Sequence, residues 1–209
     1  MNDLERALAD IRNMRSHLAR GTEFRGLGPL ALLSTSGFAI AGGLIQVRLF
    51  PGPVVQAEYW IAIWLSVAAL AFLVLGIEMI VRARREHGGL ADEMIRTAAG
   101  QLAPAQITGA LIAYVLWVHA SHALWMLPGL WQVLLALGLF GAARSLPSGF
   151  RLVAAWYLLC GLACLAFAQG SSAFSPWAMA LPFALGQALA AVIIHRDKRL
   201  AERRADHVD

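Results

Sequence analysis

Charged residues are scarce in this chain and absent from long parts of it. Asp, Glu, Lys and Arg make up 14% of the 209 residues, whereas a soluble domain carries about 25%. None of these four residue types occurs in residues 26–47, 59–77, 97–143 or 152–195. A helix needs about 20 apolar residues to cross a bilayer, so the two shorter stretches each hold one span and the two longer ones each hold two. We therefore predict an all-helical integral membrane protein with six spans, at 27–47, 58–82, 101–120, 125–144, 150–169 and 176–196.

Sequence motifs of the common enzyme classes are missing as well. The chain contains no GxxxxGK(S/T) phosphate loop, no HExxH metal motif and no GxSxG nucleophile motif. No predicted span carries the pair of carboxylates that acid–base hydrolysis requires. The two cysteines, Cys160 and Cys164, lie in the middle of the fifth span, so they indicate neither a Cys-x-x-Cys site nor a disulfide framework. These absences argue against an enzyme.

The basic residues lie almost entirely on one side of the predicted bundle. Cytoplasmic segments of membrane proteins are enriched in Lys and Arg. With the amino terminus inside, the inner segments 1–26, 82–100, 144–151 and 196–209 hold five, four, two and five of the 17 basic residues, and Arg48 alone falls on the other side. We therefore predict that both termini are cytoplasmic. The same asymmetry accounts for the net charge of +4, so we expect attraction to anionic lipid and no nucleic-acid partner.

The segment before the first predicted span has the periodicity of an amphipathic helix. Leu4, Leu8, Ile11 and Leu18 fall on one stripe of a helix over 2–20. This pattern is typical of a helix that lies on the inner membrane surface. The seven-residue spacing of Leu4, Ile11 and Leu18 also fits a coiled coil between two subunits, so a homodimer, or a complex with another membrane protein, stays open as an alternative.

A second short amphipathic helix is predicted on the cytoplasmic side, at 86–100. Gly88 and Gly89 separate it from the second span, and Pro104 then either starts the third span or kinks it. The chain thus divides into a cytoplasmic helix and linker at 1–26, a six-helix bundle at 27–196 and a basic tail at 197–209. No segment is large enough to form a separate soluble core.

Two histidines at the outer end of the third span are candidate metal ligands. His119 and His122 are three residues apart, so on a continuous helix both imidazoles would share a face. Zinc requires three or four ligands, and Glu58, predicted on the same side, is the candidate third. The alternative, which we favour, is that both histidines lie at the lipid headgroups as amphipathic rings, like Trp117 and Trp125 beside them. We accordingly expect no cofactor.

His87 and His195 are predicted to lie at the inner surface on two different helices. Haem iron is held by axial ligands on opposite faces of the ring, so this pair is the candidate haem site. It makes a haem- or metal-binding membrane redox protein one alternative function.

Glu78 is the only carboxylate that we place in the interior of a predicted span, since Glu58 is the first residue of the second span. A charge at the centre of a bilayer costs about 2.5–3.5 kcal/mol on insertion scales, so Glu78 is either functional or paired. Arg82 follows four residues later, in the order that favours a helical ion pair. We expect a structural ion pair near the interface, and the alternative is a proton-linked carboxylate that faces an inner cavity.

The fourth and sixth spans share a pattern of residue types. Each has a tryptophan at its start, a proline about a turn deeper and a glutamine about a turn beyond, namely Trp125, Pro128 and Gln132, and Trp177, Pro182 and Gln187. Proline frees a backbone carbonyl that a neighbouring group must satisfy, and glutamine forms hydrogen bonds between helices where water is scarce. The pattern predicts either contacts that hold the helices together or a polar ligand pocket open to the outer leaflet, edged by His119, His122 and Glu58.

Three blocks, TEFRGLGP at 22–29, LWMLPGLWQV at 124–133 and FSPWAMALPF at 174–183, resemble a family of small, uncharacterised six-span bacterial inner-membrane proteins. The resemblance implies six spans and a bacterial inner membrane, and it carries no activity or site residue. We expect a non-enzymatic membrane module that binds a ligand or a partner protein. A small-solute permease with a pocket at Gln132 and Gln187 is the principal alternative.

Overall fold

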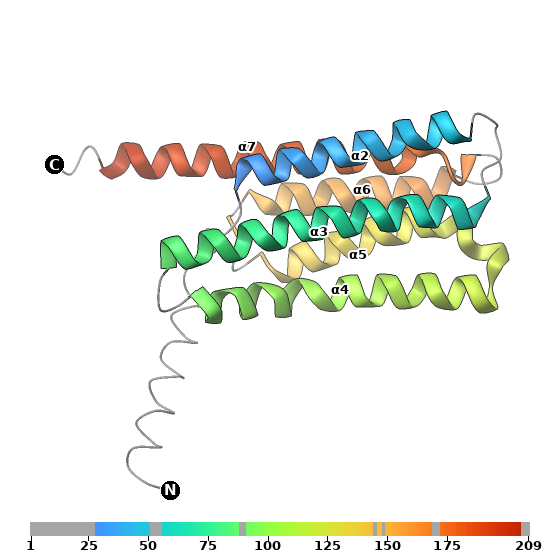
Figure 1. Cartoon of the computed structure of the whole chain (residues 1–209), viewed down its shortest axis with the longest axis horizontal. Coiled ribbons are helices and arrows are strands. Elements are labelled where there is room, and N and C mark those ends of the chain that lie inside the picture. Colours follow the sequence, from blue (N-terminus) through green and yellow to red (C-terminus); the bar gives the residue numbers. More distant parts are fainter. Residues whose placement is uncertain are drawn as a thin grey trace, which may run out of the picture.

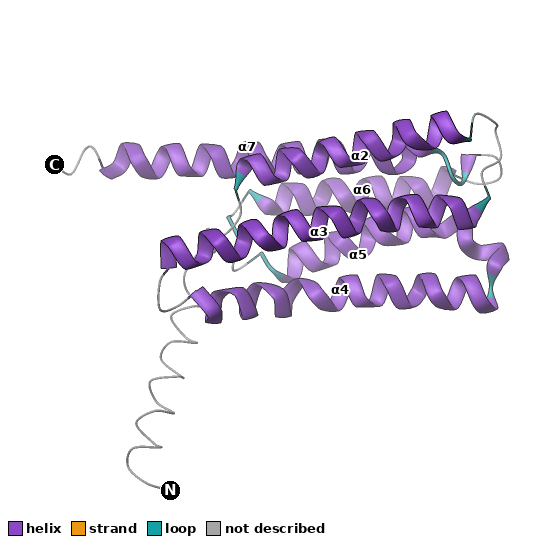
Figure 2. Ribbon diagram, in the orientation of Figure 1, coloured by secondary structure: helices purple, strands orange, loops and turns teal. Residues whose placement is uncertain are grey.

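The computed structural model describes residues 28–50, 56–87, 91–143, 146–147, 149–168 and 172–205. These residues are mostly helical and contain no strand (Figure 2). The elements are α2 (Pro29–Leu49), α3 (Ala57–His87), α4 (Ala91–His119), the 3₁₀ helix η2 (Ser121–Met126), α5 (Leu127–Gly141), α6 (Phe150–Phe167) and α7 (Pro176–Ala205). The amphipathic helix predicted at 2–20 lies outside the described residues.

Six helical stretches are long and apolar enough to cross a membrane. They are Pro29–Leu49, Ala57–Arg82, Ala99–His119, Ser121–Gly141, Phe150–Phe167 and Pro176–Asp197. The prediction of an all-helical chain with six membrane-spanning segments is confirmed, and each bound lies within four residues of the predicted one. The chain is therefore a multi-pass membrane protein by the length and apolarity of its helices.

Each of the six spans has its most extensive contacts with two others, and these contacts close into a ring. The order around the ring is α7, α2, α3, α4, α5, α6 and back to α7. The first described residue and the end of α7 lie at the same end of the bundle (Figure 1). We call this the inner end, and the opposite end, where α2 and α4 finish and α3 begins, the outer end.

Glycine lets two pairs of helices approach closely, as small residues do in membrane proteins. A Cβ added at Gly161 on α6 would lie 2.8 Å from the carbonyl oxygen of Gly129 on α5, so the two backbones meet there. A Cβ added at Gly43 on α2 would lie 2.8 Å from the Cβ of Ala180 on α7. The pairs α5–α6 and α2–α7 are therefore the most closely packed part of the ring.

Helices α3 and α4 have a smaller buried fraction than the other helices. In their apolar windows 11% of the residues are buried, against 39% in α2, in α7 and in the span formed by η2 and α5. Large apolar side chains such as Phe72, Leu73, Ile107 and Leu111 point outward from them. In a bilayer these faces lie against lipid chains or another protein.

Helix α4 corrects the expectation of a separate short helix at 86–100. Residues 91–100 are the first part of α4, which continues through Pro104 to His119. Proline removes the N–H that would bond to the carbonyl four residues earlier, at Gly100. Gly100 is exposed near the inner end, and the helix runs unbroken on both sides of Pro104, so Pro104 neither starts nor ends it.

Candidate functional site

Gln132 links α5 to α7 through the backbone that Pro182 leaves unpaired. In a regular helix the N–H of residue 182 would bond to the carbonyl of Ala178, and proline has no such N–H. The Nε2 of Gln132 donates to the Ala178 oxygen at 2.9 Å and to the Pro128 oxygen at 3.0 Å. The expectation that a neighbouring group satisfies the carbonyl freed by proline is therefore confirmed at Pro182.

The surroundings of Gln132 are tightly packed. Its side chain is fully buried, and its Nε2 lies 3.6 Å from Cys164 Sγ and 3.8 Å from Met179 Sδ. Its Oε1 has no hydrogen-bond partner among the described residues. Gln132 therefore acts in this structure as a helix–helix contact.

Gln187 makes a separate contact, with Tyr157 of α6. Its side chain forms a hydrogen bond with the Tyr157 hydroxyl, which in turn donates to the Phe183 carbonyl oxygen at 3.4 Å. A Cβ added at Gly186 would lie 2.5 Å from the Tyr157 hydroxyl oxygen, so glycine makes room for the ring. The two glutamines of the shared pattern thus serve two different interfaces, α5–α7 and α6–α7.

An aromatic cluster fills the outer half of the ring. The Trp60 ring stacks on Trp131 with centroids 5.6 Å apart and lies 5.4 Å from the ring of Phe174. The buried Gln46 of α2 accepts a hydrogen bond from Trp64 Nε1 at 3.0 Å and donates to the Phe174 carbonyl oxygen at 2.7 Å. Gln46 therefore ties α2 to α3 and to the segment that precedes α7.

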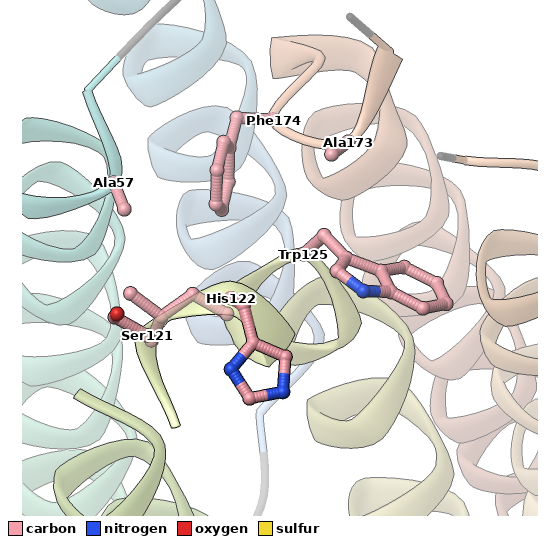
Figure 3. A pocket seen from close by; sticks show the side chains of 7 residues that line it. Ala57, Ser121, His122, Trp125, Ala173 and Phe174 are labelled. Carbon is pink, nitrogen blue, oxygen red and sulfur yellow. The ribbon is translucent and has the colours of Figure 1, made fainter. Parts of the chain in front are cut away.

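A pocket of about 370 Å³ opens at the outer end beside this cluster (Figure 3). Its wall comes from the start of α3, from η2 and from the segment before α7. The lining residues are Ala57, Ser121, His122, Leu124, Trp125, Ala173 and Phe174. Apolar side chains predominate, and Ser121 and His122 place polar groups along one side.

The pocket includes some of the residues of the predicted outer site. His122, which is itself exposed, and Trp125 line the pocket, whereas the exposed Glu58, His119 and Trp177 do not. The four deeper residues of the shared pattern are buried or half-buried and do not line it, namely Pro128, Gln132, Pro182 and Gln187.

The proposed metal ligands are not held on one helix. Helix α4 ends at His119, and the chain passes through the non-helical Ala120 into η2, which begins at Ser121. Across the described ranges, no three His, Cys, Asp or Glu side chains gather closely enough to hold a metal ion. A third ligand such as Glu58 therefore does not join the two histidines.

The candidate haem ligands lie at the inner end. His195 is exposed on α7, and His87 is the last residue of α3, with a side chain outside the described set. The axial pair therefore falls partly outside the described residues and stays a prediction.

Glu78 forms the predicted ion pair with Arg82. Its Oε1 lies 3.0 Å from Arg82 Nη2 and 3.2 Å from Nε. A Cβ added at Gly28 would lie 3.0 Å from Arg82 Nη2 and closer still to the Glu78 carboxylate. The pair therefore packs against the residue that precedes α2, where the helix dipole favours a negative charge.

Three residues that join α2 to α3 or fill the aromatic cluster were missed by the sequence analysis. Gln46 is the one amide side chain in the first span, and Trp60 and Trp64 are four residues apart and so share a helix face. Both features were visible signals for an internal contact between α2 and α3.

Comparison of the chain with protein-family models, with curated proteins and with solved structures finds no match.

Proposed function

We propose that this chain is a non-enzymatic, multi-pass protein of the bacterial inner membrane that binds a small amphipathic ligand in its outer pocket. The observation that carries the proposal is the pocket itself. Its volume of about 370 Å³ lies within the range of small-molecule sites, about 300–1,000 Å³. Phe174 and Leu124 supply apolar contact, and Ser121 and His122 supply a few polar groups. This combination is typical of sites that hold a ligand by apolar contact and orient it by polar contact.

The basic residues support the proposed orientation. Arg84, Arg85, Arg196 and Arg199 are exposed at the inner end, away from the pocket. Positive residues favour the cytoplasmic side, so with both termini in the cytoplasm the pocket opens on the outer face of the inner membrane.

The glutamine contacts favour a binding module over the alternative of a permease. A transport path needs polar side chains that face a passage. Gln132 is fully buried and donates to two carbonyl oxygens within the bundle, and Gln187 is occupied by Tyr157. These amides hold helices together, so they support a stable bundle with a site at its end.

Titration with 2-acetylnaphthalene tests the pocket, with the protein in lipid nanodiscs and tryptophan fluorescence as the readout. We expect saturable quenching beyond that caused by partition into the lipid. Ala173→Leu extends the wall into the pocket and should abolish saturable binding, and His122→Ala should weaken it. His119→Ala is the matched control, because His119 is exposed and does not line the pocket. Quenching that does not saturate, or that is the same in all variants, contradicts the proposal.

Cysteine labelling tests the orientation. In a background with Cys160→Ala and Cys164→Ala, Ser121→Cys should react with a membrane-impermeant maleimide added to intact spheroplasts. Arg85→Cys should react only after the membrane is permeabilised. The reverse pattern would place the pocket in the cytoplasm and overturn the orientation.

A further inference from the structure

Trp60 differs from the other tryptophans inside the bundle. Its side chain is completely buried, and its indole N–H has no hydrogen-bond partner among the described residues. Buried indole N–H groups ordinarily find an acceptor. Three other indoles do so here: Trp64 donates to Gln46 Oε1 at 3.0 Å, Trp131 to the Gly109 oxygen at 3.1 Å and Trp156 to the Pro182 oxygen at 2.9 Å. Trp60 therefore keeps an unused donor in an apolar interior.

Trp60 lies directly behind the wall of the outer pocket. Phe174 lines the pocket, and its ring centroid is 5.4 Å from that of Trp60. Ala57, one helical turn before Trp60 on α3, lines the pocket as well, and Leu124 belongs both to the lining and to the apolar cluster around Trp60. One aromatic ring thus separates the pocket from the indole of Trp60.

The ring of Phe174 is placed to act as a movable wall. Gln46 Nε2 holds the Phe174 carbonyl oxygen at 2.7 Å, which fixes the backbone, and the ring itself packs against the apolar cluster that contains Trp60. The side chain is only half-buried. Figure 3 shows it projecting from the segment before α7 toward Ser121 and His122. Rotation of this ring away from Trp60 would open the pocket toward the Trp60 indole.

We propose that the outer pocket extends past Phe174 to Trp60, and that its ligand is a planar, lipophilic carbonyl compound. The carbonyl oxygen accepts the hydrogen bond of the Trp60 indole. The flat apolar body takes its place beside the rings of Trp60 and Phe174 in the offset arrangement that aromatic pairs prefer, and Ser121 and His122 contact the end nearer the membrane surface. This inference rests on the proposed function and adds the chemical class of the ligand.

Two probes of nearly the same shape test the inference. 2-Acetylnaphthalene carries a carbonyl oxygen, and 2-ethylnaphthalene does not. We expect wild-type protein in nanodiscs to bind the ketone about five- to tenfold more tightly than the hydrocarbon, the value of one hydrogen bond. In Trp60→Phe, which keeps a ring and loses the N–H, this ratio should fall to about one. Trp156→Phe is the matched control, because it removes an indole N–H elsewhere and should keep the wild-type ratio.

A second measurement uses the wild-type chain alone, in case Trp60→Phe does not fold. With ¹⁵N-labelled tryptophan, the one indole N–H signal that marks Trp60 should move downfield with 2-acetylnaphthalene and stay in place with 2-ethylnaphthalene. Equal binding of the two probes, or a ratio that Trp60→Phe leaves unchanged, overturns the inference and leaves the proposed pocket standing. An indole spectrum unmoved by a bound ketone also overturns it. Failure of wild-type protein to bind either probe overturns the inference and the proposed function together.

Discussion

The bond from Gln132 to the carbonyl of Ala178 predicts a specific dependence between Gln132 and Pro182. Gln132→Met keeps the length of the side chain and removes the donor at 2.9 Å. The Ala178 oxygen then keeps only the weak thiol donor of Cys164, whose Sγ lies 3.7 Å away, and a buried acceptor left without a full partner costs about 1–3 kcal/mol in a protein interior. Interhelical hydrogen bonds in membranes are worth about 0.6 kcal/mol on average and about 1.7 at most. We therefore expect Gln132→Met to lower the free energy of unfolding by about 1–1.5 kcal/mol.

In a Pro182→Ala background the same change should cost much less. The restored N–H at position 182 bonds to the Ala178 oxygen within α7, so this oxygen no longer depends on Gln132 for a hydrogen bond. The cost of Gln132→Met should fall below about 0.5 kcal/mol, which gives a coupling energy of about 0.5–1 kcal/mol, within the range for residues in contact. Reversible unfolding in mixed micelles, followed by circular dichroism, measures the free energy of unfolding of the wild type, the two single variants and the double variant, which together form a double-mutant cycle.

Gln46→Met is the matched control for that cycle. Gln46 is equally buried, and its partners are Trp64 and the Phe174 carbonyl, neither of which depends on the proline. Its cost should therefore be the same with and without Pro182→Ala. If Gln132→Met costs the same in both backgrounds, the assignment of Gln132 to the carbonyl freed by Pro182 is wrong.

Three further predictions concern packing, charge and the backbone of α4. Gly161→Ala should lower the free energy of unfolding by about 1–3 kcal/mol, because the added Cβ would lie 2.8 Å from a carbonyl oxygen of α5. Gly37→Ala should instead raise it by about 0.5–1 kcal/mol, because a Cβ at Gly37 meets nothing within 4 Å. Equal effects of the two variants would contradict the close backbone contact. Glu78→Gln should cost about 0.5–1 kcal/mol through loss of the pair with Arg82 and leave probe binding unchanged, and a loss of binding would restore the functional interpretation of Glu78. Pro104→Ala should raise the free energy of unfolding by about 1–3 kcal/mol because it restores a helical hydrogen bond, and a destabilised variant would show that α4 requires the proline.

The positions of the spans could be predicted because an uncharged stretch of sufficient length has few alternatives to crossing a membrane. The largest difference is at the start of the fourth span, expected at 125 and observed at Ser121. There the chain reverses after Ala120 and enters a 3₁₀ helix instead of a loop. The residues of this turn carry no signal for either form, because a tight helical turn and an irregular turn require similar residues.

The sequence was enough to predict that the glutamines form contacts between helices, but it was not enough to predict which residues they contact. The sequence indicates that Pro182 leaves a backbone carbonyl unpaired and that Gln132 needs a hydrogen-bond partner. In the structure Gln132 donates to that carbonyl, the oxygen of Ala178. The sequence does not indicate that Gln187 would meet Tyr157 instead. That outcome depends on the relative depth and rotation of α5, α6 and α7, which are set by contacts such as Gly129 against Gly161. Such contacts between distant segments leave no trace in the periodicity of one helix.

The uneven burial of the helices indicates how the pocket would open. The segment before α7 is held by Gln46, and α7 itself by Gln132 and by its close contact with α2. Helix α3 supplies Ala57 to the pocket and Trp60 behind it, and only 11% of its apolar window is buried. A ligand that needs more room than rotation of the Phe174 ring provides would displace the outer end of α3 rather than α7, because among the described side chains of α3 only Trp60 and Trp64 are buried, whereas 39% of the apolar window of α7 is buried. Spin labels at Tyr59, which is exposed, and on the outer end of α7 should then move apart when 2-acetylnaphthalene binds, and an unchanged separation would assign the whole opening to Phe174.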